Sequence, residues 1–255
     1  MFKNITNNAI IGRLVNFLPS CHSTNDVGLA LIKTGDAQDG TIIITTNQTQ
    51  GRGQRGNKWV AEPGKNLTFS IILDVSFLKY EGIFGLNMAV SLGIVSFFNS
   101  TLNTQHSKLK IKWPNDLYYD DKKLGGILIE NIYRSDGSVW AVVGIGININ
   151  QVNFSYLNAT SLAAICKQFF DLEELLLKLT QEIEYYFEML REGDLHKIKP
   201  LYLQNLYHYM KFTTYRSGEE IFEGKIIDVN DIGQLVVENK AGLRVFDKQE
   251  IRFLI

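Results

Sequence analysis

The sequence has few of the residues that mark a secreted, metal-bound or membrane-spanning protein. It contains two cysteines, Cys21 and Cys166, which lie far apart, so no disulfide framework is expected. Its four histidines form no metal-ligand spacing with these cysteines, and we predict no metal centre built from protein ligands. The amino terminus lacks the pattern of a signal peptide, and no apolar run approaches the roughly 20 residues that span a bilayer. We therefore expect a cytoplasmic protein without membrane association.

An excess of either charge is also absent. The chain carries 26 Lys and Arg against 27 Asp and Glu, a formal net charge of −1 at pH 7. No global field favours DNA or another polyanion, so any anion binding must come from a local cluster of cations. The 255 residues, 45% of them hydrophobic, are enough for one large core with a small satellite domain.

A basic, glycine-rich loop is the most informative stretch. Residues 48–59 read QTQGRGQRGNKW and follow the β-branched run at residues 41–46, which predicts a strand. The glycines allow backbone N–H groups to approach a ligand, and the cations Arg52, Arg55 and Lys58 have no acid among them. Taken alone, the loop has two interpretations: an anion-binding loop mounted on a sheet, or a solvated polar turn.

Three other segments place polar residues or glycines where a ligand could meet them. Ser23, Thr24 and Asn25 precede a helical pattern and can cap that helix, bind a ligand, or do both. Residues 109–116 predict a strand that ends in Pro114, followed by Asn115 and Asp116 at a cleft or in a simple turn. The strands predicted at residues 123–130 and 141–150 are interrupted by glycine pairs. The second pair lacks the third glycine of a dinucleotide fingerprint, so we reject that reading.

Hydrophobic periodicity predicts the remaining elements. A strand is expected at residues 66–74, and amphipathic helices at 84–102, 171–190 and 195–209, the last one interrupted or started by Pro200. From Lys211 onward the chain turns to short β-rich segments with glycine turns, which predict a small five-stranded barrel. The expected fold class is α+β, with a catalytic domain at residues 1–210 and a barrel domain at 211–255.

In this order, the motifs resemble those of the biotin–protein ligases, also called biotin–[acetyl-CoA-carboxylase] ligases. The matching runs are GRGQRGNKW at 51–59, KWPND at 112–116, KLGGILIE at 123–130 and GIGIN at 144–148, with Ser-Thr-Asn at 23–25 upstream. The resemblance covers essentially the whole chain. It implies a mixed β-sheet packed with helices, like that of class II aminoacyl-tRNA synthetases, followed by an SH3-like β-barrel. The expected type is monofunctional, without an N-terminal DNA-binding domain.

The resemblance also implies a reaction with two steps. Biotin and ATP, with Mg²⁺, give biotinyl-5′-AMP and pyrophosphate. The adenylate then acylates one lysine of a biotin carboxyl carrier domain, which is the expected partner. Members of this group also pair through sheet edges, so a homodimer is conceivable. Binding of DNA is not expected.

Site residues follow from the same resemblance. Lys123 would bridge the biotin carboxylate and the α-phosphate, Arg52 would close over the adenylate, and Asp116 would orient Lys123 or the acceptor lysine. Mg²⁺ and the phosphates would lie near Asn148, and no residue is assigned as a metal ligand. The expected biotin-binding residues are Ser23, Thr24, Asn25, Gln48, Gly51, Arg52, Trp59, Lys123 and Gly126; those for ATP or the adenylate are Arg52, Gly53, Arg55, Lys58, Lys112, Asn115, Lys123 and Asn148.

One departure and two alternatives accompany this reading. Gln54 stands where better-known members carry a further arginine, so retention of the adenylate is expected to be looser unless Arg55 supplies the contact. Lipoate–protein ligase, with the same fold and adenylation chemistry, is the alternative enzyme. A non-catalytic biotin-binding module is the alternative from another class. Pyrophosphate release that requires both ATP and biotin would separate the three.

Overall fold

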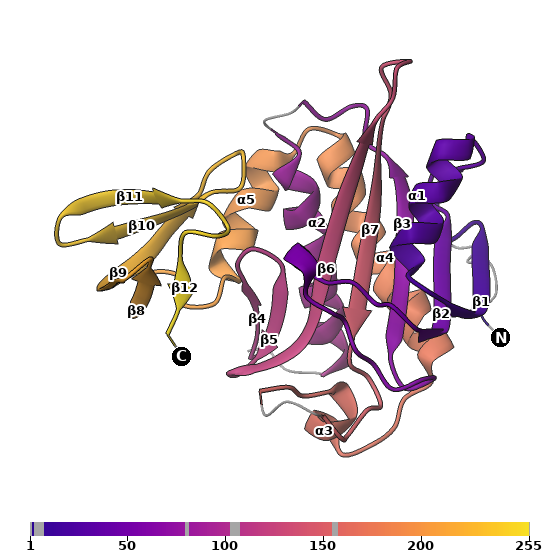
Figure 1. The fold of residues 1–255 in the computed structure, drawn as a ribbon, viewed down its shortest axis with the longest axis horizontal. Helices are drawn as coiled ribbons and strands as arrows, with labels where there is room; N and C mark the ends of the chain where they lie inside the picture. The colour runs from indigo at the N-terminus through magenta and orange to yellow at the C-terminus, as the bar shows by residue number, and fades with distance from the viewer. Residues whose placement is uncertain (1, 3–7, 80–81, 103–107, 155–157, 255) are drawn as a thin grey trace.

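Two β-sheets organise the protein, which is described here from a computed structural model (Figure 1). The structure describes residues 2, 8–79, 82–102, 108–154 and 158–254, with the side chain of Arg55 left out. The first sheet has seven strands and carries the helices; the second has five strands and comes from the carboxyl-terminal part of the chain. The predicted α+β class is therefore confirmed.

The seven-stranded sheet is mixed, as predicted. Its strand order is β1-β2-β3-β7-β6-β5-β4, with β1 and β2 parallel and every other neighbouring pair antiparallel. Strands far apart in sequence thus become neighbours, which brings β2 and β3 beside the β5–β7 meander. The strands are β1 (Val15–Cys21), β2 (Ile42–Gln48), β3 (Leu67–Asp74), β4 (Leu109–Lys112), β5 (Asp116–Tyr119), β6 (Lys122–Tyr133) and β7 (Val139–Ile147).

Helices cover both faces of this sheet (Figure 1). On one face, α1 (Thr24–Thr34) closes a small core that includes Ile32 and Ile43. On the other face, α2 (Phe84–Thr101), α4 (Leu172–Arg191) and α5 (Leu195–Gln204) enclose the main core, which takes Ile42 and Ile44 from the same strand. The alternation of strand side chains between opposite faces explains why three consecutive isoleucines serve two cores. A short helix, α3 (Leu162–Cys166), follows β7.

The amphipathic character predicted for α2 is wrong. Nearly every residue of α2 is buried, because the sheet packs on one side and α4 on the other. Gly93 makes this closeness possible, since a Cβ there would lie 2.6 Å from the Ile183 Cα of α4. By length and composition alone this 18-residue helix could cross a membrane, contrary to the expectation that no run comes near that length, but 78% of it is buried inside the fold. We identify α2 as the central core helix.

Some element boundaries also differ from the prediction. The apolar run at residues 10–18 predicts a short strand or extended lead-in that ends at Pro19, whereas β1 begins at Val15 and continues through Pro19 to Cys21. Helix α5 ends at Gln204 and contains Pro200 within it. Pro19 is tolerated because β1 is the edge strand of the sheet, where one side of the strand has no hydrogen-bonding neighbour.

The predicted carboxyl-terminal β unit is a five-stranded antiparallel sheet with the order β11-β10-β9-β8-β12. It lies beside α5 (Figure 1) and joins the first part of the chain through polar contacts. The indole Nε1 of Trp113 donates to the Gly233 carbonyl at 3.0 Å, and Lys199 pairs with Asp228 at 3.2 Å. The strands are β8 (Phe212–Ser217), β9 (Glu220–Val229), β10 (Leu235–Asn239), β11 (Gly242–Phe246) and β12 (Arg252–Phe253). The domain boundary at residue 210 stays a prediction.

A buried carboxylate fastens the segment before β1 to α4. Glu184, 7% exposed, accepts hydrogen bonds from the backbone N–H groups of Ala9, Ile10 and Ile11. Three donors satisfy one carboxylate, so the charge is well stabilised in its buried position. The same contact seats Ile11, which is fully buried in the main core.

We predict that Glu184→Ala lowers the free energy of unfolding by about 2 kcal/mol or more, because it leaves buried N–H groups without an acceptor. Urea denaturation measures this change. Glu188→Ala, on the same helix, is the matched control. It removes only a surface pair with Arg191 and should cost less than about 1 kcal/mol. Equal losses in the two variants would contradict the role given to Glu184.

Candidate active site

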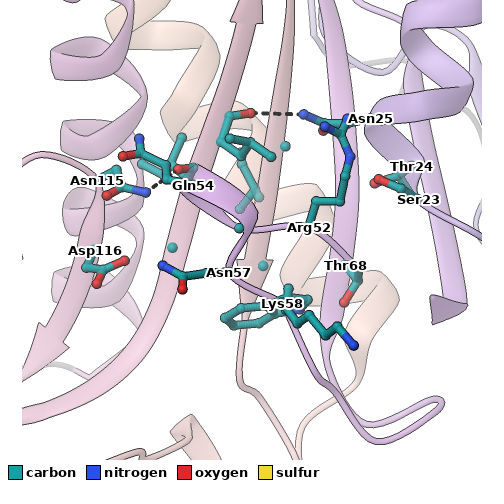
Figure 2. A pocket seen from close by; sticks show the side chains of 18 of the residues that line it. Ser23, Thr24, Asn25, Arg52, Gln54, Asn57, Lys58, Thr68, Asn115 and Asp116 are labelled. Carbon is teal, nitrogen blue, oxygen red and sulfur yellow. Dashed lines mark hydrogen bonds between the residues drawn. The ribbon is translucent and has the colours of Figure 1, made fainter. Parts of the chain in front are cut away.

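One pocket collects most of the residues that the sequence nominated. It has a volume of about 210 Å³ and lies between the start of α1, the glycine loop after β2, and strands β5 to β7. Figure 2 shows Asn115 and Asp116 on one side, Ser23, Thr24 and Asn25 on the other, and the loop residues Gln54 and Asn57 between them. The nominated residues that line it are Ser23, Thr24, Asn25, Gln48, Arg52, Gly53, Lys58, Trp59, Asn115, Asp116, Lys123 and Gly126.

The glycine loop is folded back on itself. The N–H of Trp59 donates to the Gly51 carbonyl at 2.9 Å, and the N–H of Gly53 donates to the Asn57 carbonyl at 2.7 Å. Gly51 has no room for a side chain, because a Cβ there would lie 2.3 Å from the Trp59 carbonyl oxygen and 2.6 Å from Gln48 Nε2. The described part of the loop is therefore an ordered turn rather than a loose polar one, with its cations at the pocket.

The glycines of β7 make room for pocket side chains. A Cβ on Gly144 would lie 2.2 Å from Asn25 Oδ1, and a Cβ on Gly146 would lie 2.5 Å from the Trp59 ring. Trp59 thus lies flat against bare backbone and forms a wall of the pocket. Its indole Nε1 is buried and has no hydrogen-bond partner among the described residues. The GIGIN glycines therefore serve side-chain packing, which agrees with the rejection of a dinucleotide fingerprint.

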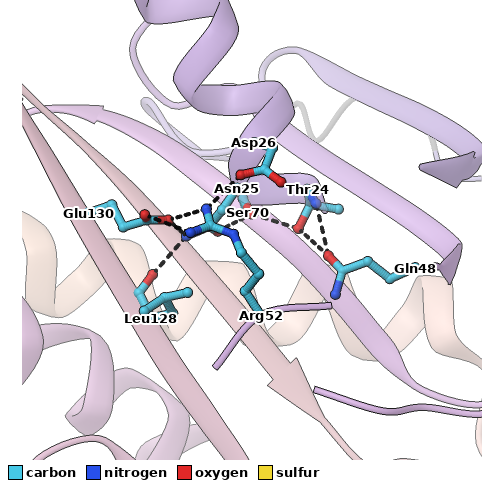
Figure 3. A network of polar contacts seen from close by, with 8 residues as sticks. All are labelled: Thr24, Asn25, Asp26, Gln48, Arg52, Ser70, Leu128 and Glu130. Atoms are coloured by element: carbon cyan, nitrogen blue, oxygen red, sulfur yellow. Dashed lines mark hydrogen bonds and ion pairs between the residues drawn. The ribbon is translucent and has the colours of Figure 1, made fainter. Parts of the chain in front are cut away.

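A chain of polar contacts joins the residues at the start of α1 to the sheet (Figure 3). Gln48 Oε1 accepts from the Thr24 N–H at 2.8 Å, and Ser70 Oγ lies 2.7 Å from Thr24 Oγ1 and 2.6 Å from Asn25 Oδ1. Asn25 Nδ2 in turn donates to Glu130 Oε2 at 2.8 Å. Both Thr24 and Asn25 are thereby engaged by the protein. Ser23 occupies the N-cap position of α1, yet its side chain makes no capping hydrogen bond.

Lys123 and Asp116 form an ion pair at the opposite side of the pocket. Lys123 Nζ lies 2.7 Å from Asp116 Oδ1, and Gly126 stands directly opposite Asp116 in the β5–β6 ladder. A Cβ on Gly126 would lie 3.3 Å from that carboxylate oxygen and 3.7 Å from Lys123 Nζ, so the glycine leaves space for the pair. Beside them, Asn115 Nδ2 donates to the Ile127 carbonyl at 2.7 Å, which holds the Asn115 side chain against β6.

Arg52 reaches from the glycine loop to two carboxylates that sequence reasoning did not nominate. Its Nη1 and Nη2 donate to Glu130 at 3.0 and 2.7 Å, and Nη2 also lies 2.7 Å from Asp26 Oδ1. Burial lowers the pKa of Arg52, but the hydrogen bonds to Glu130 and the negative charges of Glu130 and Asp26 outweigh this effect. The pKa of Arg52 is therefore raised above its ordinary value. Glu130 ends the KLGGILIE run and Asp26 follows Ser-Thr-Asn, so both lay next to recognised motifs.

Several nominated residues do not line the pocket. Lys112 instead places Nζ 4.5 Å from the centre of the Tyr118 ring. Burial lowers the pKa of Lys112; the positive charge of Lys123 lowers it too, while the negative charge of Asp116 acts in the opposite direction. Asn148 is 1% exposed and donates from Nδ2 to the Thr160 carbonyl. Gly51 lies in the loop base, as described above. The side chain of Arg55 lies outside the described part of the structure.

Other lining residues were not nominated as site residues from the sequence. Among them is Lys248, which comes from the segment between β11 and β12, so the second sheet contributes a cation to the pocket. Its side chain also lies near the Phe84 ring, with Nζ 5.7 Å from the ring centre. No local pattern marks such a residue, because only the packing of the two sheets brings it to the site. The remaining lining residues that were not nominated as site residues are Gln54, Asn57, Thr68, Phe69, Pro114, Ile127, Leu128, Gly144, Ile145 and Gly146.

Comparison with known proteins finds similarity to proteins named as ligases. Residues 17–150 match the model of the Biotin/lipoate A/B protein ligase family. The bifunctional ligase/repressor BirA of Escherichia coli (strain K12) is 34% identical over 144 residues, which cover 55% of this chain and 43% of that protein. Biotin–protein ligase 2 of Arabidopsis thaliana is 28% identical over 214 residues, which cover 82% and 63%. The chain thus spans less than two thirds of the length of these relatives.

Solved structures share the fold. A biotin protein ligase from Aquifex aeolicus in complex with biotin and ATP superposes with a TM-score of 0.78 at 24% identity, covering 95% of this chain and 100% of that one. A biotin protein ligase-like protein of unknown function from Silicibacter superposes with a TM-score of 0.70 at 12% identity, covering 96% of both chains. At these identities the likeness establishes the fold, and a shared fold does not by itself assign an activity.

We predict that Gly146→Ala displaces Trp59 from its seat on β7, because the new methyl group would overlap the indole ring. The expected cost is about 1–3 kcal/mol of stability, with a shift in tryptophan fluorescence as Trp59 meets water. Gly82→Ala is the control, since a Cβ there has nothing within 4 Å. An unchanged spectrum in Gly146→Ala would contradict the packing described for Trp59.

Proposed function

The chain belongs to the Biotin/lipoate A/B protein ligase family, and from that premise we propose that it is a biotin–protein ligase. In this proposal it joins biotin and ATP into biotinyl-5′-AMP and then transfers biotin to a lysine of a carboxyl carrier domain. The observation that carries the proposal is the single pocket in which Lys123 and Arg52 face polar residues suited to a small amphipathic acid.

The first step requires two anions to meet. A carboxylate oxygen attacks the α-phosphorus of ATP, an acyl–phosphate bond forms, and the bond to pyrophosphate breaks. Positioning and charge stabilisation dominate phosphoryl transfer, so fixed cations are what the protein must supply. We assign Lys123 to the biotin carboxylate and the α-phosphate, because its ammonium is fixed at the pocket wall by an ion pair. The distance from Lys123 Nζ to Asp116 Oδ1 is 2.7 Å. Arg52 and Lys58 would hold the phosphate from the glycine loop.

The biotin end is assigned to the part of the pocket near α1. Gln48 has its Oε1 occupied by Thr24, which leaves the Nε2 donors for the carbonyl of the ureido ring. The Ser23 hydroxyl, which forms no cap, is a second candidate partner. Trp59 and Leu128 would cover the apolar part of the bicyclic ring.

Mg²⁺ is assigned a place with the ATP phosphates. Among the described residues there is no group of three or more His, Cys, Asp or Glu that could hold a metal ion. This fits a cation that is bound through one or two carboxylates and the substrate phosphates. Asp116 is the carboxylate among the described residues that line the pocket; Asn148 does not line it, so its place near the ion stays a prediction from the sequence. Bound there, the ion would neutralise phosphate charge.

The second step and its partner are proposed from the same chemistry. The acceptor lysine must lose a proton before it attacks the acyl carbon and displaces AMP, and Asp116 is the candidate to orient it. The partner would be a carrier domain of a carboxylase, and the reaction would take place in the cytoplasm. A homodimer and the lack of DNA binding stay predictions from the sequence.

Lipoate ligation is the alternative to test, because the matching family model includes both biotin and lipoate enzymes. The relatives named above favour biotin. One of the matched proteins is also named Biotin–[acetyl-CoA-carboxylase] ligase, from Mycobacterium tuberculosis, 27% identical over 173 residues covering 68% of this chain and 63% of that protein.

Mass spectrometry of a carrier domain incubated with the protein, ATP, Mg²⁺ and biotin tests the proposal. We expect a mass gain on one lysine with biotin and none with lipoate. Lys123→Ala should slow the reaction about 100-fold or more, since one preorganised charge contact to the reacting oxygens is lost. Lys178→Ala, which breaks a surface pair with Glu174, is the control and should react normally. Modification by lipoate would redirect the assignment; no modification would leave a binding module.

Arg52→Ala tests the assignment of the glycine loop. Affinity for biotinyl-AMP should fall about tenfold or more, because a charge-assisted contact to the phosphate is lost. Affinity for biotin alone should change little. Isothermal titration with each ligand measures both. Equal losses for the two ligands would refute the closure of Arg52 over the adenylate.

A further inference from the structure

Arg52 is a pocket residue whose guanidinium contacts two carboxylates, and the stronger contact is with Glu130. Both terminal nitrogens of the guanidinium meet both oxygens of Glu130, the fork geometry that fixes an arginine side chain in angle as well as distance. Asp26 touches one nitrogen only. Figure 3 shows the Arg52 side chain rising from the loop to lie between these two acids.

Glu130 is itself held from the buried side. Its Oε2 accepts from Asn25 Nδ2 at 2.8 Å, and Asn25 is 3% exposed, with Ser70 Oγ 2.6 Å from its Oδ1. Ser70 is fully buried in β3. The carboxylate of Glu130 thus stands at the end of a rigid polar chain that begins inside the sheet, whereas half of the Asp26 side chain is exposed.

We propose that Glu130 is a positioning residue that fixes Arg52, and through it the glycine loop, in the place where the loop meets the adenylate. The identity of the ligand, biotinyl-AMP, rests on the proposed function, whereas the contact between Glu130 and Arg52 does not. A glycine-rich loop loses much conformational freedom when it is ordered. The two hydrogen bonds from Arg52 to Glu130, which is itself held by buried Asn25, order the loop before the ligand binds. Glu130 does not line the pocket, so it would act on the ligand through Arg52.

A competing account predicts the opposite effect of the two acids on adenylate binding. Two carboxylates around one guanidinium leave a net negative charge, and they could instead withhold Arg52 from the phosphate. In that case neutralising either acid would tighten adenylate binding. If the role is positioning, only Glu130, which bonds both terminal nitrogens of Arg52 and is held by buried Asn25, should strongly affect the retention of the adenylate. The two acids of this chain therefore provide the discriminating pair.

The test compares Glu130→Gln and Asp26→Asn in the full-length protein. Dissociation of biotinyl-AMP is followed by stopped flow, and biotin KM is measured beside it. We expect Glu130→Gln to release the adenylate about tenfold faster, as loss of a charged hydrogen bond implies, with biotin KM changed less than about threefold. Asp26→Asn should have a clearly smaller effect. Tighter retention in both variants would overturn the proposal in favour of competition, and unchanged retention in Glu130→Gln would overturn it outright.

Trypsin cleavage within residues 52–58 of the ligand-free protein gives a readout that does not depend on ligase activity. Glu130→Gln should be cleaved several-fold faster than the unaltered protein, while Glu174→Gln, which loses only a surface pair, should not. Thermal unfolding confirms that each variant is folded. If no biotinylation occurs yet cleavage accelerates, the proposed function fails and the fixing of the loop by Glu130 stands. If biotinylation occurs and cleavage does not change, the fixing fails alone.

Discussion

The pairing of two pocket cations, Lys123 and Arg52, with carboxylates is the interaction on which the site depends. Lys123 and Arg52 lie in one small cavity, where unpaired charges of like sign would repel and spread apart. Asp116 on β5 offsets the first, and Glu130 on β6 offsets the second. Both acids are on strands of the same sheet, so the sheet fixes how far apart the two cations stand. The charged groups are therefore in place before any ligand neutralises them.

Glycine determines how closely the parts of the site approach one another. On β7, Gly144 and Gly146 leave bare backbone that Asn25 and Trp59 cover. On β6, Gly126 leaves the volume in which the Lys123–Asp116 pair lies. These glycines are thus steric complements of named side chains. A pocket built this way is sensitive to single methyl groups, because close-packed interiors cannot absorb added volume without shifting.

Local patterns were sufficient to predict most of the fold and the motifs, and they failed where long-range packing decides. The strands at residues 66–74 and 141–150 and the helix before Arg191 followed from periodicity. The amphipathic reading of α2 failed because the helix buries polar as well as apolar residues along most of its length: Ser91 is fully buried and Asn87 is 7% exposed. Glu130 was within a recognised motif, yet only the folded sheet shows that it faces Arg52. Lys248 could not have been found from its neighbours in sequence.

The position of Lys248 has a consequence for how the pocket comes into being. The lining residues run from Ser23 to Lys248, so the cavity is complete only after the second sheet has packed against the first. The first sheet can fold earlier during synthesis, since domains form as units from the amino-terminal side. A nascent chain that has reached α5 would already hold the helices of the main core and the pairs of Arg52 and Lys123, but not Lys248. Assembly of this site is therefore a late step in synthesis, because it requires residues as far along the chain as Lys248.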